Sequence, residues 1–99
     1  MRSGYNIRWT SNASEELANT IQYLEDNFSS KEIKKLAKNI EEVIQLLALN
    51  PTLFTKSESE NIYRVVILKF NTMYYRLQNN EVEILSFFSN RQNPNKTKL

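Results

Sequence analysis

Five side chains in the C-terminal part of the chain are suited to contacts with an anion or an exposed base. They are Arg64, Tyr74, Tyr75, Arg76 and Arg91. Arginine offers a planar fork of donors that fits phosphates and carboxylates, and tyrosine rings can stack on bases. The chain contains no Cys and no His, which excludes a thiolate nucleophile and the usual general base at neutral pH. It also removes the common zinc ligands, so we expect no metal and no cofactor.

The alternation of side chains along a strand decides which of these residues can act together. Successive residues point to opposite faces of a sheet, so Tyr74 and Arg76 share one face and Tyr75 lies on the other. With Arg64 on the neighbouring strand, we expect two arginines and one tyrosine on the face away from the helices, and Arg91 close to it. Such a group suits a phosphate backbone with a stacked base. The alternative is that Arg64 and Arg76 are ordinary solvent-facing residues and that Tyr75 belongs to the core.

The first part of the chain predicts a strand followed by a helix. Apolar and polar residues alternate over residues 5–9, which is typical of a strand with one buried face. Helical spacing of apolar residues follows, and we expect Asn12 to cap this helix with Glu15 at its third position. The helix should end near Asn27.

A second helix is predicted from Ser29 onward. Ser29 and Glu32 fit a capping box, and the dipeptide Asn50-Pro51 ends the pattern. The short connection predicts an antiparallel helical hairpin with a shared apolar seam. Four lysines crowd the first half of this helix, and we interpret them as a solvated face without a function. They are Lys31, Lys34, Lys35 and Lys38.

Three strands are predicted after a polar loop over residues 52–61. Continuous runs of β-branched and aromatic residues cover 62–68, 73–77 and 82–88, with short turns between them. The single glycine lies at position 4, so asparagine must supply the left-handed backbone of the turns. We expect Asn71, Asn79 and Asn80 to do so. Residues 91–99 are polar and should form a frayed tail.

These elements predict an α+β fold in one domain that spans residues 1–99. A separate N-terminal strand and a three-stranded antiparallel meander can form one mainly antiparallel sheet, with the helical hairpin on one face. Whether the first strand lies at the edge or the centre of the sheet stays open.

Charge is unevenly distributed along the 99 residues. The formal net charge is +2, but residues 1–60 carry seven Lys/Arg against nine Asp/Glu, and residues 61–99 carry six against two. The basic second part favours an anionic partner, although chance gives small domains similar imbalances. No apolar run approaches the length needed to cross a bilayer, so we expect a cytoplasmic protein without a membrane partner.

In its order of elements and in several short motifs, the chain resembles the RelE/ParE superfamily, the toxins of bacterial type II toxin–antitoxin modules. The resemblance extends from Tyr5 to Pro94. The motifs, none specific alone, are Ser11-x-Ala13, Glu16-Leu17, Tyr23, Leu49-Asn50-Pro51, Tyr63-Arg64, Tyr74-Tyr75, Val82-Glu83-Ile84-Leu85, Arg91 and Pro94.

The resemblance implies a plasmid-stabilisation toxin that a cognate antitoxin neutralises in a hetero-oligomer. ParE-like members inhibit DNA gyrase by binding it, whereas RelE-like members cut mRNA on the ribosome without a metal. The long helical hairpin and the few catalytic candidates favour the ParE-like branch. A histidine common in the superfamily would fall near Ser89, and its absence also counts against the nuclease. A third alternative is a non-toxic remnant that only binds an antitoxin.

If the chain is RelE-like, the resemblance implies catalytic roles for the five residues named first. Arg64 and Arg76 would stabilise the phosphate, Tyr74 or Tyr75 would stack on a base, and Arg91 would be a weak acid. Whether the chain is an enzyme therefore depends on the branch. The same arginines would also suit the acidic side chains of an antitoxin.

Overall fold

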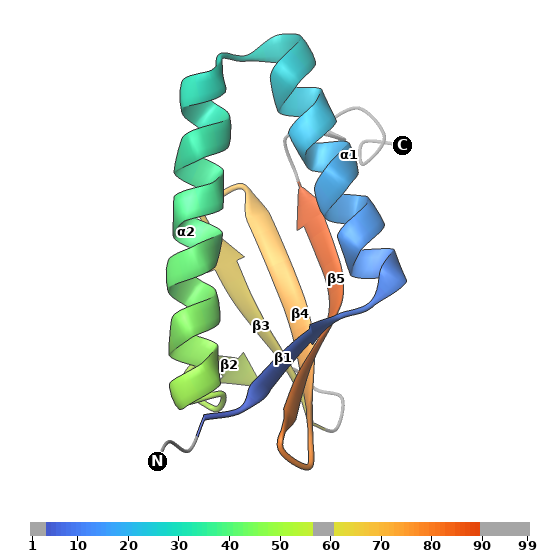
Figure 1. The fold of residues 1–99 in the computed structure, drawn as a ribbon, viewed down its shortest axis with the longest axis vertical. Coiled ribbons are helices and arrows are strands. Elements are labelled where there is room, and N and C mark those ends of the chain that lie inside the picture. Colours follow the sequence, from blue (N-terminus) through green and yellow to red (C-terminus); the bar gives the residue numbers. More distant parts are fainter. Residues whose placement is uncertain (1–3, 57–60, 90–99) are drawn as a thin grey trace.

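The computed structural model describes residues 4–56 and 61–89, which form two helices and one sheet (Figure 1). The helices run antiparallel and lie side by side over one face of the sheet, as predicted. The element bounds are β1 Asn6–Trp9, α1 Ser11–Asn27, α2 Ser30–Leu49, β2 Thr55–Lys56, β3 Ile62–Ile67, β4 Asn71–Gln78 and β5 Glu81–Ser89.

The order of strands in the sheet is β1-β5-β4-β3-β2. The first strand therefore lies at an edge, a point that the sequence left open. It runs parallel to β5, with Asn6 opposite Glu81 and Trp9 opposite Ile84, while the other pairs are antiparallel. The predicted α+β class and the mainly antiparallel sheet are confirmed.

The start of α1 differs from the prediction by two residues. Thr10, not Asn12, is the cap, because its hydroxyl oxygen accepts a hydrogen bond from the Ala13 amide at 3.1 Å. The same hydroxyl donates to the Ile84 carbonyl at 2.8 Å. The helix thus begins where β1 leaves β5, and this tertiary contact decides between neighbouring residues that all favour a cap position. The predicted end at Asn27 is confirmed.

The second helix has the predicted extent but not the predicted capping box. Ser29 is the N-cap residue, yet its side chain makes no capping hydrogen bond. The helix ends at Leu49 and is followed by Asn50 and Pro51, as the sequence predicts. Within the predicted loop over residues 52–61, the structure adds the two-residue strand β2, which pairs with β3 through Thr55 and Arg64.

The turns of the sheet use fewer asparagines than predicted. A positive φ is found at Asn79 in the β4–β5 turn, but neither Asn71 nor Asn80 has one. In the β3–β4 turn, Leu68 and Lys69 have φ values of 51° and 62°. Such a backbone costs a residue with a side chain about 1–2 kcal/mol. Asn61 is the remaining residue with a positive φ among those described.

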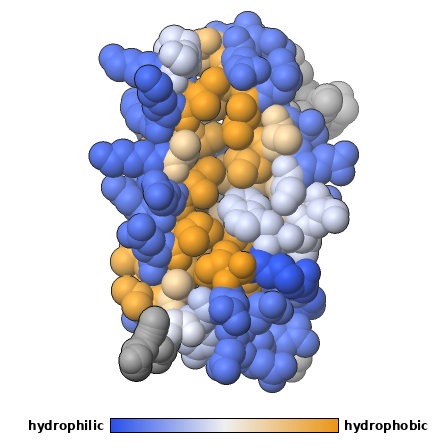
Figure 2. All heavy atoms as spheres, viewed as in Figure 1, coloured by the Kyte–Doolittle hydropathy of each residue, from blue (hydrophilic) through white to orange (hydrophobic). Residues whose placement is uncertain are grey.

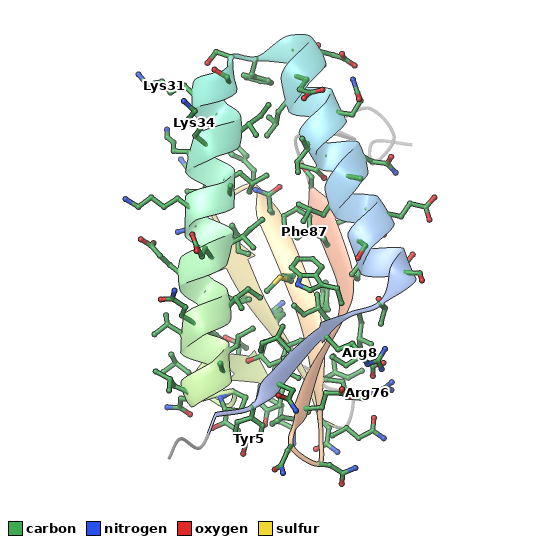
Figure 3. All side chains as sticks on the ribbon, in the orientation of Figure 1. Tyr5, Arg8, Lys31, Lys34, Arg76 and Phe87 are labelled. Carbon is green, nitrogen blue, oxygen red and sulfur yellow. The ribbon has the colours of Figure 1, made fainter. Side chains whose placement is uncertain are left out.

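The core lies between the helices and the inner face of the sheet. A β-bulge in β5 changes its alternation, because Tyr74 pairs with Ser86 but Tyr75 pairs with Ile84. With one residue extra, Phe87 points inward like Ile84, and Figure 3 shows Phe87 between the helices and the sheet. The buried apolar residues are Ala13, Leu24, Leu36, Val43, Leu47, Val65, Ile67, Met73, Tyr75, Val82, Ile84 and Phe87.

Candidate functional site

The outer face of the sheet, away from the helices, brings three of the five candidate residues together. Arg64 is exposed on β3 and lies directly opposite Tyr74 on β4. Arg76 follows two residues after Tyr74 and lies opposite Glu83 on β5. The predicted sharing of one face by these side chains is confirmed, since each lies next to a buried residue, Val65 or Tyr75, that points to the other face.

Arg76 is held in a cluster of four charged side chains, which we call the ion cluster: Arg8, Arg76, Glu81 and Glu83. Arg76 donates to the Glu83 carboxylate from Nη2 at 2.8 Å and from Nε at 3.3 Å. Arg8 on β1 donates to the other oxygen of the same carboxylate, and its Nε lies 3.5 Å from Glu81. Figure 3 shows Arg8 and Arg76 side by side at the lower end of the sheet.

The ion cluster is electrically balanced and partly shielded. Glu83 is only 8% exposed. The hydrogen bond from Arg76 is the main reason that the pKa of Glu83 lies below its ordinary value, and the charge of Arg8 adds to this effect. A phosphate that bound Arg76 through Nε and Nη2 would compete with the Glu83 carboxylate for these donors. Arg76 thus joins β4 to β5, and Arg8 joins β1 to the same carboxylate.

Tyr75 lies on the opposite face from Tyr74 and is 0% exposed. Its hydroxyl donates to the Pro51 carbonyl at 2.6 Å, and its ring stacks on that of Tyr63 with centroids 5.4 Å apart. Burial raises the pKa of Tyr75 well above its usual range. Tyr75 is therefore a core residue, which was the alternative interpretation of its role. Of the two tyrosines, only Tyr74 could stack on a base at the outer face.

The remaining candidate, Arg91, lies outside the described residues. Ser89, at the position where the resemblance places a histidine in other members, is 5% exposed and lies opposite Asn71. Of the candidates within the described residues, Arg64 and Tyr74 are those on the outer face that the ion cluster does not hold. No ion pair joins Arg64 to another residue in the described ranges 4–56 and 61–89.

Sequence reasoning did not find the contact that fixes α1 against the sheet. The Glu16 carboxylate accepts hydrogen bonds from the Phe87 amide at 2.8 Å and from the Ser86 hydroxyl at 2.9 Å. Asn12 donates to the Leu85 carbonyl at 2.9 Å. These bonds provide partners for polar groups of β5 at and after the bulge. There β1 has ended, and within the described residues no other strand pairs with this edge.

An apolar groove lies between α1 and α2, on the helical side of the molecule. The ion cluster lies on the other side, on the outer face of the sheet. Figure 2 shows a band of hydrophobic side chains between the polar outer flanks of α1 and α2. The predicted seam exists, but it is open to solvent because the helices are spread apart over the sheet. This interhelical groove has a volume of about 260 Å³ and is lined by Leu17, Ile21, Ile33, Leu36, Ala37, Ile40 and Glu41.

Within the part of the chain that the structure describes, neither a metal site nor a membrane-spanning helix is found. No group of three or more Asp, Glu, Cys or His side chains could hold a metal ion. No helix is long and apolar enough to cross a membrane.

Solved structures show where else this fold occurs. A chain described as "Chromosomal ParDE TA system from P. aeruginosa" superposes with a TM-score of 0.71 at 16% identity, covering 86% of this chain and 95% of the other. The crystal structure of TrmO from Pseudomonas aeruginosa gives a TM-score of 0.55 at 17% identity, over 90% of this chain but only 37% of that one. At these identities the likeness establishes the fold alone, and the first match shares it over nearly the whole length of both chains.

The family follows from the sequence itself. The family model described as "ParE toxin of type II toxin-antitoxin system, parDE" matches residues 7–94. The chain therefore belongs to the ParE toxin family, and the predicted resemblance is confirmed. A search of curated proteins gives no match.

Proposed function

We propose that this type II toxin acts in the cytoplasm by binding a protein target, DNA gyrase, and that a cognate antitoxin neutralises it. The observation that carries this choice is the ion cluster. Arg76 donates from Nε and Nη2 to Glu83, which leaves Arg64 and Tyr74 as the candidates outside the ion cluster among the described residues of the outer face. The five candidates include no His, Asp or Glu that could serve as a general base, so the outer face favours binding over cleavage.

The interhelical groove supports the antitoxin part of the proposal. It is apolar and open along the axis between two helices, which is the shape that accepts the apolar face of an amphipathic helix. Leu17, Ile21 and Ile40 are half-buried there, and no helix or strand of residues 4–56 and 61–89 covers them. We infer that a helical segment of the antitoxin binds in this groove and buries these side chains.

The target is tested by assaying the purified chain in two reactions in parallel. We expect inhibition of gyrase supercoiling with gyrase-dependent DNA breaks, and no cuts in mRNA on translating ribosomes. Ribosome-dependent mRNA cleavage would overturn the gyrase proposal. Normal growth on expression, with neither activity, would leave only an antitoxin-binding remnant.

The antitoxin site is tested with two exposed helical alanines as a matched pair. Ala37→Glu places a charge in the interhelical groove, whereas Ala18→Glu places one on the exposed surface of α1 outside it. The first should weaken binding of the cognate antitoxin by about ten-fold or more, and the second should not. Equal affinities for the two variants would exclude the groove.

A ribosome-dependent mRNA endonuclease is the second candidate, and one observation favours it. Arg64 and Tyr74 are direct register partners on an open sheet face, where a phosphate and a base could be held together. In that case the double variant Arg64→Ala and Arg76→Ala should abolish mRNA cleavage. Unchanged cleavage would remove these residues from the mechanism.

A further inference from the structure

A second hollow lies at the end of the fold opposite the ion cluster. It has a volume of about 350 Å³ and is enclosed by the facing parts of α1 and α2, the β3–β4 turn and the end of β5. We call it the hairpin pocket. Buried Leu24 and Leu36 form its apolar floor, and Leu68 and Phe70 of the turn, 37% and 38% exposed, form a wall. It shares only Leu36 with the interhelical groove.

The wall of the hairpin pocket is formed by a turn whose backbone conformation is energetically unfavourable for its residues. Leu68 and Lys69 both adopt left-handed conformations, which favour glycine or asparagine. In the other hairpin turn the chain has asparagine at the left-handed position, Asn79. A bulky apolar residue held in this conformation and left partly exposed points to a role outside folding.

The rim of the pocket is basic. Lys35 and Lys69 line it, together with one carboxylate, Glu32. Lys35 belongs to the row of lysines in the first half of α2, and Figure 3 shows Lys31 and Lys34 extending from the same end of the helix. Of the four lysines, Lys35 is the one that lines the pocket. A strained turn and two cations, Lys35 and Lys69, therefore meet at this pocket.

We propose that the hairpin pocket receives a large apolar side chain carried by an acidic segment of the toxin's protein target. The inference rests on the proposed function that the toxin acts by binding a protein. The volume suits one or two anchoring side chains, and anchors of this kind carry most of the binding energy of an interface. Carboxylates on both sides of the anchor would face Lys35 and Lys69. A nucleic acid is less suited, because the aliphatic floor offers no ring on which a base could stack.

Leu68→Asn separates a binding role from a structural one. Asparagine tolerates the left-handed backbone at this position, so the variant should melt at or above the temperature of the unmodified toxin. The apolar wall is nevertheless lost, and we expect about ten-fold weaker inhibition of purified gyrase and loss of growth arrest on expression. A role confined to the fold would instead make stability and toxicity fall together.

Charge reversal tests the acidic character of the partner. Lys35→Glu and Lys69→Glu should each weaken growth arrest and gyrase inhibition by about ten-fold, with an effect that shrinks as salt rises. Lys56→Glu on β2 is the matched control outside the pocket, and it should behave like the unmodified toxin. All variants should keep their affinity for the antitoxin, which shows that they are folded.

The outcomes distinguish this inference from the function on which it rests. If the unmodified toxin arrests growth but does not inhibit gyrase, gyrase is not the target. The growth assay of the variants would then still test whether the hairpin pocket is needed for toxicity. Full growth arrest by Leu68→Asn and both reversals would overturn the pocket alone. An unmodified toxin that leaves growth normal would overturn both. Tight binding of a short DNA duplex that only the lysine reversals abolish would assign the rim to nucleic acid instead.

Discussion

The two hairpin turns of the sheet reach the same left-handed backbone with different residues. The β4–β5 turn uses Asn79, and the strands behind it are joined by the ion cluster, in which every charge has a partner. The β3–β4 turn uses Leu68 and Lys69 and leaves apolar side chains exposed beside lysines. One end of the sheet is optimised for folding, and the other retains features that folding alone would not favour.

Replacement of Tyr75 by alanine should have the largest effect on stability. The ring is fully buried, stacked on Tyr63 and bonded to the Pro51 carbonyl, so we expect a loss of about 3–5 kcal/mol in the free energy of unfolding. Chemical denaturation measures it. Tyr75→Phe should cost about 1–3 kcal/mol, because it keeps the ring but leaves the carbonyl without its donor. A loss below 1 kcal/mol for alanine would mean that this end of the core can be repacked.

Glu83→Gln should lower the melting temperature at pH 7 by less than Tyr75→Ala does. It removes the carboxylate that pairs with Arg76 and leaves Arg8 with Glu81 as its remaining charged partner in the ion cluster. The folded-state pKa of Glu83 lies below its ordinary value of 4.5. Its ion pairs therefore stabilise the fold above that pH and cease to do so as the pH falls through the folded-state pKa.

Thermal melts of Glu83→Gln and the unmodified toxin over a pH series test this expectation. The difference between the two melting temperatures should be constant near neutral pH and shrink below about pH 4.5. A difference that does not change with pH would show that shape, not charge, explains the effect of Glu83.

Asn79→Ala should produce a smaller loss, because alanine pays the steric cost of the left-handed backbone that asparagine tolerates. We expect about 1 kcal/mol of lost stability. The measurement is again the free energy of unfolding, with Asn80→Ala as the matched control, since Asn80 does not have a positive φ. Equal losses for both variants would contradict the assignment of the left-handed position.

Lys69→Asn should have the smallest effect, and it should be of opposite sign. Relief of the backbone strain favours the variant by up to about 1 kcal/mol. Loss of the contact between Lys69 Nζ and the Phe70 ring, 5.6 Å to the centroid, offsets about 0.5 kcal/mol of that gain. A destabilised Lys69→Asn would show that the two turns do not differ in strain.

Much of this architecture could be predicted because it depends on local periodicity. The alternation that places Arg64 and Arg76 on one face is visible in the sequence, as are the apolar stripes of both helices. The pairing of Arg76 with Glu83 and Arg8 was not predictable, because it requires the strand order β1-β5-β4 to be known.

Other differences arose where distant contacts compete with local preference. Thr10 caps α1 because its hydroxyl also donates to the Ile84 carbonyl. The residue types that favour a cap position do not reveal this contact with a distant strand. The β3–β4 turn departs from the usual residue preferences altogether. Both helical hollows depend on how far the helices spread, which apolar spacing does not encode.

The parallel pairing of β1 with β5 has a consequence for synthesis of the toxin. Arg8 and Glu83 are separated by 75 positions in the chain, so the first strand has no place in the sheet until β5 has been made. Contacts between such distant segments form late in folding. The sheet therefore cannot be completed before β5 has been synthesised, and a nascent chain that stops before β5 lacks the edge on which β1 depends.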